Sequence, residues 1–293
     1  MFPFDLPGPQ FLGFYALFAS AVIAAFHFGR RQYESGPIPS IDLTDPFLFA
    51  CLRGGPKEVV RIATLGLIDR GLLKAEGASG SMLTRAPEAK PELVRRRIEK
   101  EVLSYFERSA DIDSVLERPA AERVAAEDYE DQLRRYQLVP DAEMLKTRFL
   151  FLAATLAALI GVAGTKLAVA LSAGRSNVLF LIVMMAIAAF VAIKIRSPYR
   201  TALGDACLDG VRSMFSGLQG RAASIRPGSG SRELLWLTAL FGAAALPTSA
   251  FPFVPQLWPK PRQSSSSGCG SSCGSSGGSG CGGGGGGCGG CGS

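Results

Sequence analysis

The residues best suited to chemistry are five cysteines within the last 25 of the 293 residues. Structural zinc sites combine two close Cys pairs, or a Cys pair with a His pair, and only the final Cys-x2-Cys has that spacing. The first two cysteines form a looser Cys-x3-Cys pair, and soft thiolates also suit copper(I). We therefore predict a candidate Zn²⁺ or Cu(I) site formed by Cys269, Cys273, Cys281, Cys288 and Cys291.

Three alternatives to a metal site stay open for these cysteines. They form disulfides if they lie on the oxidising side of a membrane, which leaves one cysteine for a partner. They are substrates of a modifying enzyme, or they are incidental thiols in a flexible extension. Residues 263–293 hold 15 Gly, 10 Ser, 5 Cys and one Gln, too little apolar surface to offset backbone ordering, so we expect disorder there. Four prolines between residues 252 and 261 predict a stiff spacer before this tail.

The rest of the sequence holds no recognisable catalytic set. His27 is the sole histidine, which excludes a His-dependent triad or a multi-histidine metal site within one chain. We expect it to lie at the membrane interface. Gly54-Gly55-Pro56-Lys57 lacks the phosphate-loop pattern. The acids between residues 122 and 131 are typical of a solvated helix face. We predict a protein that is not an enzyme and has no catalytic residue or resident cofactor.

Three long apolar segments are the elements that must position the candidate site. They cover about Phe11–Phe28, Phe149–Leu171 and Val178–Ile193, and the first has no formal charge. At 1.5 Å per residue, the 18 residues of the first cover roughly 27 Å, about one hydrocarbon core. The last two are joined by a short connection, which predicts an antiparallel hairpin. We expect three membrane spans, with Lys166 close enough to one end of the second to reach the headgroups.

The placement of basic residues predicts an orientation. Arg30 and Arg31 follow the first segment, Lys146 and Arg148 precede the second, and Lys194 and Arg196 follow the third. Because cytoplasmic flanks carry the excess of Lys and Arg, we expect the N-terminus outside and residues 30–148 in the cytoplasm of a bacterial inner membrane. Residues 194–232 hold 7 Lys/Arg against 2 Asp/Glu, which puts this segment on the same side.

A fourth apolar stretch, from Leu234 to Val254, leaves two alternatives. Its strongly apolar part ends at Leu246 and is short for a span, and three prolines follow. If it crosses the membrane, the cysteines lie outside. If it is an interfacial helix, they lie in the cytoplasm.

Residues 40–148 are long enough to form a small core. A capped helix begins at Thr44-Asp45-Pro46, a second covers 56–70, and a hairpin follows over 72–85. Further helices are expected over 91–108 and 120–136. The order over 45–86 resembles a winged helix leading into its wing. Between Arg30 and Arg148, 20 Lys/Arg face 21 Asp/Glu, so this module is expected to contact protein rather than nucleic acid.

Several motifs together carry a family resemblance. Pro3–Leu12 precedes a span, Asp45-Pro46 is followed by Leu52-Arg53-Gly54-Gly55-Pro56, and then by Leu67-Ile68-Asp69-Arg70-Gly71-Leu72-Leu73. With the Gly/Cys tail, they resemble a family of uncharacterised bacterial membrane proteins defined by a domain next to Gly/Cys-rich low-complexity tails. The resemblance implies no activity, substrate or catalytic residue. This chain departs from it in a tail diluted with serine and a weak fourth span.

The predicted fold class is a mainly α membrane protein with three or four transmembrane helices, a small α+β winged-helix-like cytoplasmic domain and a disordered tail. Its partners are the lipid bilayer and an unknown protein. The leading hypothesis is a non-enzymatic interaction or scaffold module presenting a thiol-rich tail; the alternatives are a soft-metal or modified tail and a membrane-tethered transcription regulator. The domains expected are 1–29 (anchor), 30–148 (cytoplasmic), 149–193 (hairpin), 194–233 (basic segment), 234–258 (fourth span or interfacial helix) and 259–293 (spacer and tail).

Overall fold

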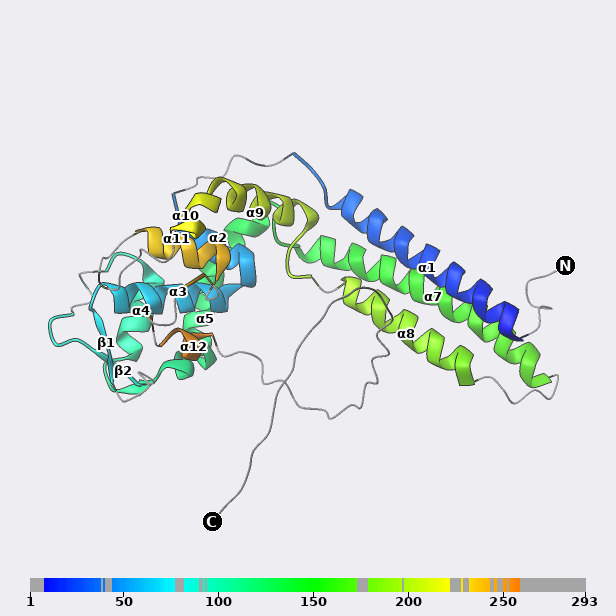
Figure 1. The fold of residues 1–293 in the computed structure, drawn as a ribbon, viewed down its shortest axis with the longest axis horizontal. Helices are drawn as coiled ribbons and strands as arrows, with labels where there is room; N and C mark the ends of the chain where they lie inside the picture. Colours follow the sequence, from blue (N-terminus) through cyan, green and yellow to red (C-terminus); the bar gives the residue numbers. More distant parts are fainter. Residues whose placement is uncertain are drawn as a thin grey trace, which may run out of the picture. The chain divides into compact units, whose positions relative to one another are not determined.

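The computed structural model shows a mainly helical chain, as predicted (Figure 1). Residues 1–259 form one unit and residues 260–293 a second, which lies outside the described residues together with all five candidate ligand cysteines. The residues described are 8–37, 39, 44–76, 82–89, 92, 94–172, 179–196, 198–221, 228, 232–242, 245–246, 250–251 and 253–258.

Three apolar helices form where the sequence predicts them: α1 (Gly8–Tyr33), α7 (Ala142–Ser172) and α8 (Leu179–Arg196). In α1 and α7, the segments Gln10–Tyr33 and Ala142–Val169 are long and apolar enough to cross a membrane. The apolar part of α8 is shorter, Leu179–Ile195. By length and composition, the structure therefore confirms two candidate spans.

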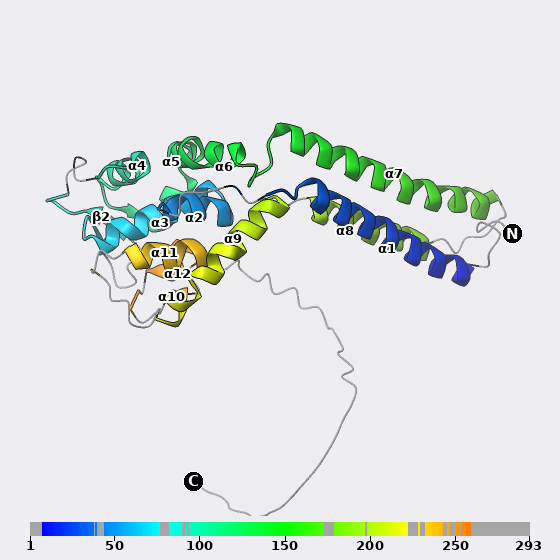
Figure 2. The same ribbon diagram turned by 90° about the horizontal axis from the view of Figure 1, so that it is seen from above.

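These three helices pack side by side, and we call them the three-helix bundle (Figures 1 and 2). Small residues at the contacts, such as Ala19, Ala163 and Ala188, let the helices approach closely. The hydroxyl of Tyr15 is fully buried and donates to the carbonyl of Leu159 at 3.3 Å. One face of each helix is thus committed to the others.

The globular part of the chain begins with α2 (Pro46–Gly54) and α3 (Pro56–Asp69). Asp45 caps α2, since its carboxylate accepts from the Phe47 amide at 2.9 Å. Gly55, at φ 85°, separates the two helices. This is the left-handed region that favours glycine, so the predicted helix boundary is confirmed.

A small antiparallel sheet follows, in the order β1-β2-β3. In the hairpin, β1 (Leu73–Glu76) pairs with β2 (Met82–Arg85) so that Leu73 faces Arg85. The two-residue strand β3 (Ala110–Asp111) adds to the other edge of β2. Leu73 and Leu83 are buried, which fixes the register by placing both on the core side. The predicted hairpin is confirmed.

The helical elements after the hairpin are α4 (Arg97–Tyr105), a 3₁₀ turn (Ile112–Glu117), α5 (Pro119–Ala125), a π turn (Ala126–Glu130) and α6 (Asp131–Arg135). The helix predicted over 120–136 is thus present, with a π turn in its middle. Tyr129, in that turn, stacks on Phe47 at 6.0 Å between ring centroids and accepts a hydrogen bond from Arg96 at 3.0 Å. The turn therefore aims an aromatic side chain back at α2.

Among the described residues C-terminal to the bundle, four helices return to the same core: α9 (Ala202–Met214), α10 (Ser216–Gly220), α11 (Arg232–Phe241) and α12 (Val254–Leu257). Leu208 of α9, Leu237 of α11 and Leu257 of α12 are buried in one cluster with α2 and α3. The globular core is therefore built from chain segments on both sides of the α7–α8 hairpin. This differs from the expected separate domains 30–148, 194–233 and 234–258.

The stretch 234–258, expected as a fourth span or an interfacial helix, contributes α11 and α12 to this packing. The helix α11 has ten residues, too few to cross a hydrocarbon core, and packs against α2 and α3. Trp236 lies between Phe49 and Phe215, with ring centroids 5.5 and 4.9 Å away. The apolar character of this stretch therefore serves the globular core.

The winged-helix likeness extends only to the order of helices and hairpin. In α3, the presumed recognition helix, Lys57 is the one exposed residue. Another helix, α11, covers α3 so closely that a Cβ on Gly66 would lie 3.1 Å from Leu235. A recognition helix must present a face to the major groove, and α3 has none free.

Candidate functional site

The most heavily charged buried feature lies where the bundle meets the globular part, and we call it the joint. It contains Arg30 and Glu34 at the end of α1, Arg148 of α7, the linker 198–201 before α9, and Ala202, the first residue of α9. The exposed fractions of Arg30, Glu34 and Arg148 are 7%, 3% and 2%. Burying three ionised groups is costly unless they pair, so their partners decide what the joint does.

Each side-chain nitrogen of Arg148 has a hydrogen-bond partner. Its Nε donates to Glu34 Oε1 at 2.6 Å, while Nη1 and Nη2 donate to the carbonyls of Pro198 and Arg200 at 2.8 and 3.0 Å. A guanidinium has a fixed fork of donors, so this set defines one orientation. A single side chain therefore ties α7 to the end of α1 and to the linker that follows α8.

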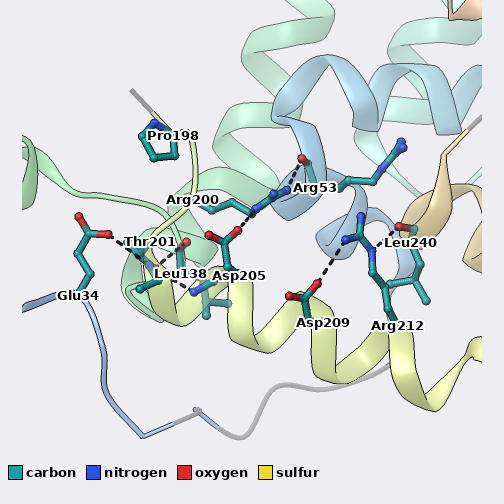
Figure 3. Close-up of polar contacts among 12 residues, drawn as sticks. Glu34, Arg53, Leu138, Pro198, Arg200, Thr201, Asp205, Asp209, Arg212 and Leu240 are labelled. Carbon is teal, nitrogen blue, oxygen red and sulfur yellow. Dashed lines mark hydrogen bonds and ion pairs between the residues drawn. The ribbon is translucent and has the colours of Figure 1, made fainter. Parts of the chain in front are cut away.

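Glu34 is shared between two cations. Its Oε2 lies 3.7 Å from Arg30 Nη1 and accepts a hydrogen bond from the amide of Ala202 at 3.2 Å. Figure 3 shows Glu34 pointing from the end of α1 toward the start of α9. Nε and Nη1 of Arg30 are buried without a hydrogen-bond partner in the described part of the chain. The joint thus holds two guanidinium groups around one carboxylate.

The linker and α9 connect the joint to the globular core (Figure 3). Arg200 pairs with Asp205 at 2.6 Å and donates to the carbonyl of Arg53, at the end of α2, at 2.7 Å. Thr201 caps α9, accepting from the Gly204 amide at 3.0 Å, and donates to the carbonyl of Gln137 at 2.8 Å. Arginines suit such positions because carbonyls at helix C-termini lack intrahelical donors.

The same arrangement recurs at the other end of α9. Arg212 contacts Asp209 at 3.4 Å and donates to the carbonyl of Leu240, at the end of α11, at 2.9 Å (Figure 3). Near the start of α9, a Cβ on Gly204 would overlap the Leu138 carbonyl oxygen. Hydrogen bonds from Arg200 and Arg212, and the close approach at Gly204, therefore hold α9 against α2, α11 and the segment before α7.

A second charged cluster holds the end of the described chain. Glu58 of α3 accepts from Arg61 at 2.5 Å, from Arg53 and from the indole nitrogen of Trp258 at 3.0 Å. Glu58 is 8% exposed, and burial lowers the pKa of Arg53 against the opposing effect of Glu58. Trp258 is thereby fastened to the N-terminal turn of α3.

Two surface depressions adjoin at the joint, and we call them together the joint groove. One is an open hollow of about 440 Å³, lined among others by Glu130, Arg134, Leu145, Arg148, Pro198 and Tyr199. The other is apolar and lies along one face of α7, lined by Ala142, Leu145, Lys146, Phe149 and Leu150. Leu145 borders both. We call the hollow, which mixes charged and apolar side chains, the polar end of the groove, and the depression on α7 its apolar end.

The two cysteines within the described residues are buried and have unreactive thiols. Cys51 and Cys207 are free thiols, 0% and 5% exposed. Burial raises the pKa of Cys51 to about 12, although the hydroxyl of Tyr199 at 3.8 Å opposes the shift, and burial also raises the pKa of Cys207. Because thiolates are the reactive species, neither is suited to catalysis or metal binding at neutral pH.

His27, Lys166 and two of the acids between residues 122 and 131, all noted in the sequence, make contacts that the structure explains without chemistry. His27 lies in α1 with its ring edge-on to Phe28 at 5.6 Å. Lys166 is 9% exposed, with Nζ 4.9 Å from the centre of the Phe11 ring. Arg97 pairs with Glu127 and Asp128. Within the described ranges, no three His, Cys, Asp or Glu residues gather as a metal site would require.

Sequence reasoning missed the pairing of Glu34 with Arg148 and the role of Trp258. Arg148 was predicted only as a basic flank, and nothing local distinguishes Glu34 from other acids. The one signal is a carboxylate within one turn of Arg30 and Arg31 at the end of an apolar segment. Chemically, the joint has ion pairs and carbonyl contacts that fix positions; it holds no nucleophile beside a base.

Comparison with known proteins adds no relative: no protein-family model matches the chain, and neither a curated protein nor a solved structure does. The fold and the joint define the class of protein. The chain is a mainly helical protein with two helices long and apolar enough to cross a membrane. Its bundle is connected through a buried charged joint to a globular core.

Proposed function

We propose that the protein is an integral membrane scaffold, in which α1, α7 and α8 cross the bilayer and hold the globular core at one membrane face. The observation that carries this proposal is the location of exposed apolar side chains. Of the 19 large hydrophobic residues exposed in the described ranges, 18 lie on these three helices, and Met214 is the exception. A contiguous apolar surface of this kind needs lipid or a partner to cover it.

The orientation follows from charge. The basic residues Arg31, Lys146 and Lys194 lie at the ends of the three helices that adjoin the globular core. The positive-inside rule then assigns the globular core to the cytoplasm of a bacterial inner membrane and the N-terminus to the opposite side. The topology has three spans, with α8 tilted little because its apolar part is short.

The side of the tail follows from α11 and α12. Both pack in the globular core, and Trp258 is bonded to Glu58. Residues 259–293 contain no apolar run that could cross a bilayer. The tail therefore leaves on the same side as the globular core, and its five cysteines face the reducing cytoplasm as thiols. Such a layout suits a module that presents a thiol-rich tail to a protein partner.

Topology is tested by labelling single cysteines with a membrane-impermeant maleimide. In one variant Cys291 is kept and the other four tail cysteines are Ser; Lys57→Cys and Phe2→Cys, with all five tail cysteines replaced, report on the core and the N-terminus. We expect only Phe2→Cys to react in spheroplasts, and Cys291 and Lys57→Cys to react after permeabilisation. Reaction of Cys291 without Lys57→Cys would place the tail opposite the core. Release of the chain by alkaline carbonate would overturn membrane integration.

A second candidate function is soft-metal binding by the tail, and its cytoplasmic side favours it because thiols there stay reduced. Cys269, Cys273, Cys281, Cys288 and Cys291 would supply thiolate ligands to Zn²⁺ or Cu(I). Intact-mass spectrometry of the full chain purified from its native cells tests this. Retained metal that is lost when the five cysteines are replaced by Ser supports it; five unmodified, metal-free thiols would sink it. A mass increase on cysteine would instead indicate enzymatic modification.

A membrane-tethered transcription regulator is the weakest of the three hypotheses. Ten of the 14 residues of α3 are buried, and one of its two basic residues, Arg61, is paired with Glu58. Phosphate contacts need accessible Lys and Arg side chains, and base contacts need an exposed helix face. Sequence-selective DNA binding by the full chain at physiological salt would reverse this ranking.

A further inference from the structure

The joint groove has charged side chains at one end and apolar side chains at the other, as a phospholipid has a charged headgroup and apolar acyl chains. Its polar end carries Arg134 and Tyr199, and its apolar end carries Phe149 and Leu150, with Leu145 between them. On α7, residues 142, 145, 146, 149 and 150 lie at helical spacing on one face. A phospholipid lying along the groove would place its headgroup at the polar end and an acyl chain at the apolar end.

The groove lies at the level where the exposed apolar surface begins. Lys146 is exposed, and the next turn of α7 exposes Phe149, Leu150 and Phe151. Lys and Arg near the ends of spans extend their charges to the headgroups while their aliphatic stems stay in the apolar region. The polar end of the groove is thus at headgroup depth in the topology proposed above.

Two accessible cations border the groove. Arg134 has a side chain 47% exposed and pairs with Glu130 at 2.7 Å and with Asp131 at 3.6 Å. Its guanidinium has five N–H donors, so it can keep Glu130 and still bind a phosphate oxygen. Lys146 has no ion pair within the described ranges, although the exposed Glu143 lies one turn away.

The charge of the joint behind the groove favours an anion as well. Arg148 lines the groove, and each of its three nitrogens already donates to Glu34 or to a backbone carbonyl, so we assign it no direct contact with the ligand. With Arg30 it leaves two guanidinium groups around one carboxylate. A buried excess of positive charge is costly, and a nearby anion lowers that cost.

We infer that the joint groove binds a phospholipid, with its phosphodiester between Arg134 and Lys146 and an acyl chain along Phe149 and Leu150. This inference rests on the proposed membrane topology. It assigns the groove a ligand class, a glycerophospholipid, and it makes the lipid part of the joint that fixes the globular core to the bundle. Basic pockets at the cytoplasmic face of helix bundles favour anionic headgroups.

The test uses the full chain in detergent micelles and follows thermal unfolding. Dioleoylphosphatidylglycerol is the probe, dioleoylglycerol supplies the same chains without phosphate, and inorganic phosphate supplies the anion without chains. The variant Arg134→Gln/Lys146→Gln removes both cations. Its matched control is Arg135→Gln/Lys74→Gln, which removes two exposed cations outside the groove.

We expect the phosphatidylglycerol to raise the unfolding temperature of the wild type and of the control equally, and that rise to fall by at least half in Arg134→Gln/Lys146→Gln. Equal shifts in all three proteins, or an equal shift with dioleoylglycerol, would overturn the inference. The same shift with inorganic phosphate would assign the site to a soluble anion instead. If the chain resists carbonate extraction but shows no shift that depends on the groove, the lipid inference is wrong and the proposed topology stands. If carbonate releases the chain, both are wrong.

Discussion

Glu34 and Arg148 are 114 positions apart in the sequence and lie 2.6 Å apart in the structure, with side chains 1% and 3% exposed. Their ion pair connects the end of the first apolar helix to the start of the second. Arg30 adds a second cation to the same carboxylate. One buried carboxylate therefore faces both guanidinium groups of the joint.

Replacing Glu34 by Gln should destabilise the protein strongly. It leaves Arg30 and Arg148 buried without a carboxylate, and breaking a buried ion pair costs about 3–5 kcal/mol. Thermal unfolding of the full chain in detergent measures the loss, with Glu143→Gln, an exposed acid on α7, as the control. The double variant Glu34→Gln/Arg148→Gln should recover part of the loss. Equal unfolding temperatures for Glu34→Gln and Glu143→Gln would contradict this role for the joint.

Two glycines of α9 should respond to alanine with opposite signs. A Cβ at Gly204 would overlap the Leu138 carbonyl oxygen, so α9 must move and about 1–3 kcal/mol of stability is lost. At Gly210 an added Cβ would meet no atom within 4 Å, and Gly→Ala inside an exposed helix gains about 0.5–1 kcal/mol. The free energies of unfolding of the two variants decide this. A stabilised Gly204→Ala protein would show that α9 does not approach residue 138 as closely as described.

The protein should lose stability in alkaline solution. The pKa of Cys51 is raised from 9.0 to about 12 by burial, and that of Tyr129 from 10.0 to about 12, also mainly by burial. The folded state keeps these groups protonated while the unfolded state releases the protons. Their contribution is therefore complete below about pH 9 and is lost as the pH rises toward 12.

The alkaline loss is measured by denaturant unfolding at several pH values. Cys51→Ala should flatten the profile between pH 9 and 12, by a difference on the order of 4 kcal/mol across that window for a shift of three units. Native Cys51 and Cys207 should also resist alkylation at pH 8 until the chain is unfolded. A Cys51→Ala profile parallel to the wild type would contradict the assignment.

Two leucines separate core burial from lipid exposure. Leu237 of α11 is 0% exposed and Leu17 of α1 is 74% exposed. Leu237→Ala should cost about 2–5 kcal/mol, because it removes buried methyl groups and leaves a cavity. Leu17→Ala should cost little in detergent micelles, since its environment is apolar solvent in either case. If Leu237→Ala were as mild as Leu17→Ala, α11 would not be a core helix.

Local features of the fold were predictable from the sequence because their causes are local. Asp45 followed by Pro46 caps α2, Gly55 ends it, and the hairpin register follows from Leu73 and Leu83. The apolar runs of α1 and α7 identify two helices of spanning length by composition alone. The metal prediction for the five tail cysteines concerns residues outside those described, and it stays a prediction.

Tertiary structure decided what apolar and charged residues do once they meet distant partners. The sequence around Trp236 has the hydropathy of a weak span, but Phe49 and Phe215 enclose that side chain in the core. The sequence of α3 has the position of a recognition helix, but α11 covers it. Glu34 became a joint residue only because Arg148 reaches it from 114 positions away. Hydropathy and helical period act over a few turns, whereas the cost of burying a charge or an aromatic ring depends on which segments pack around it.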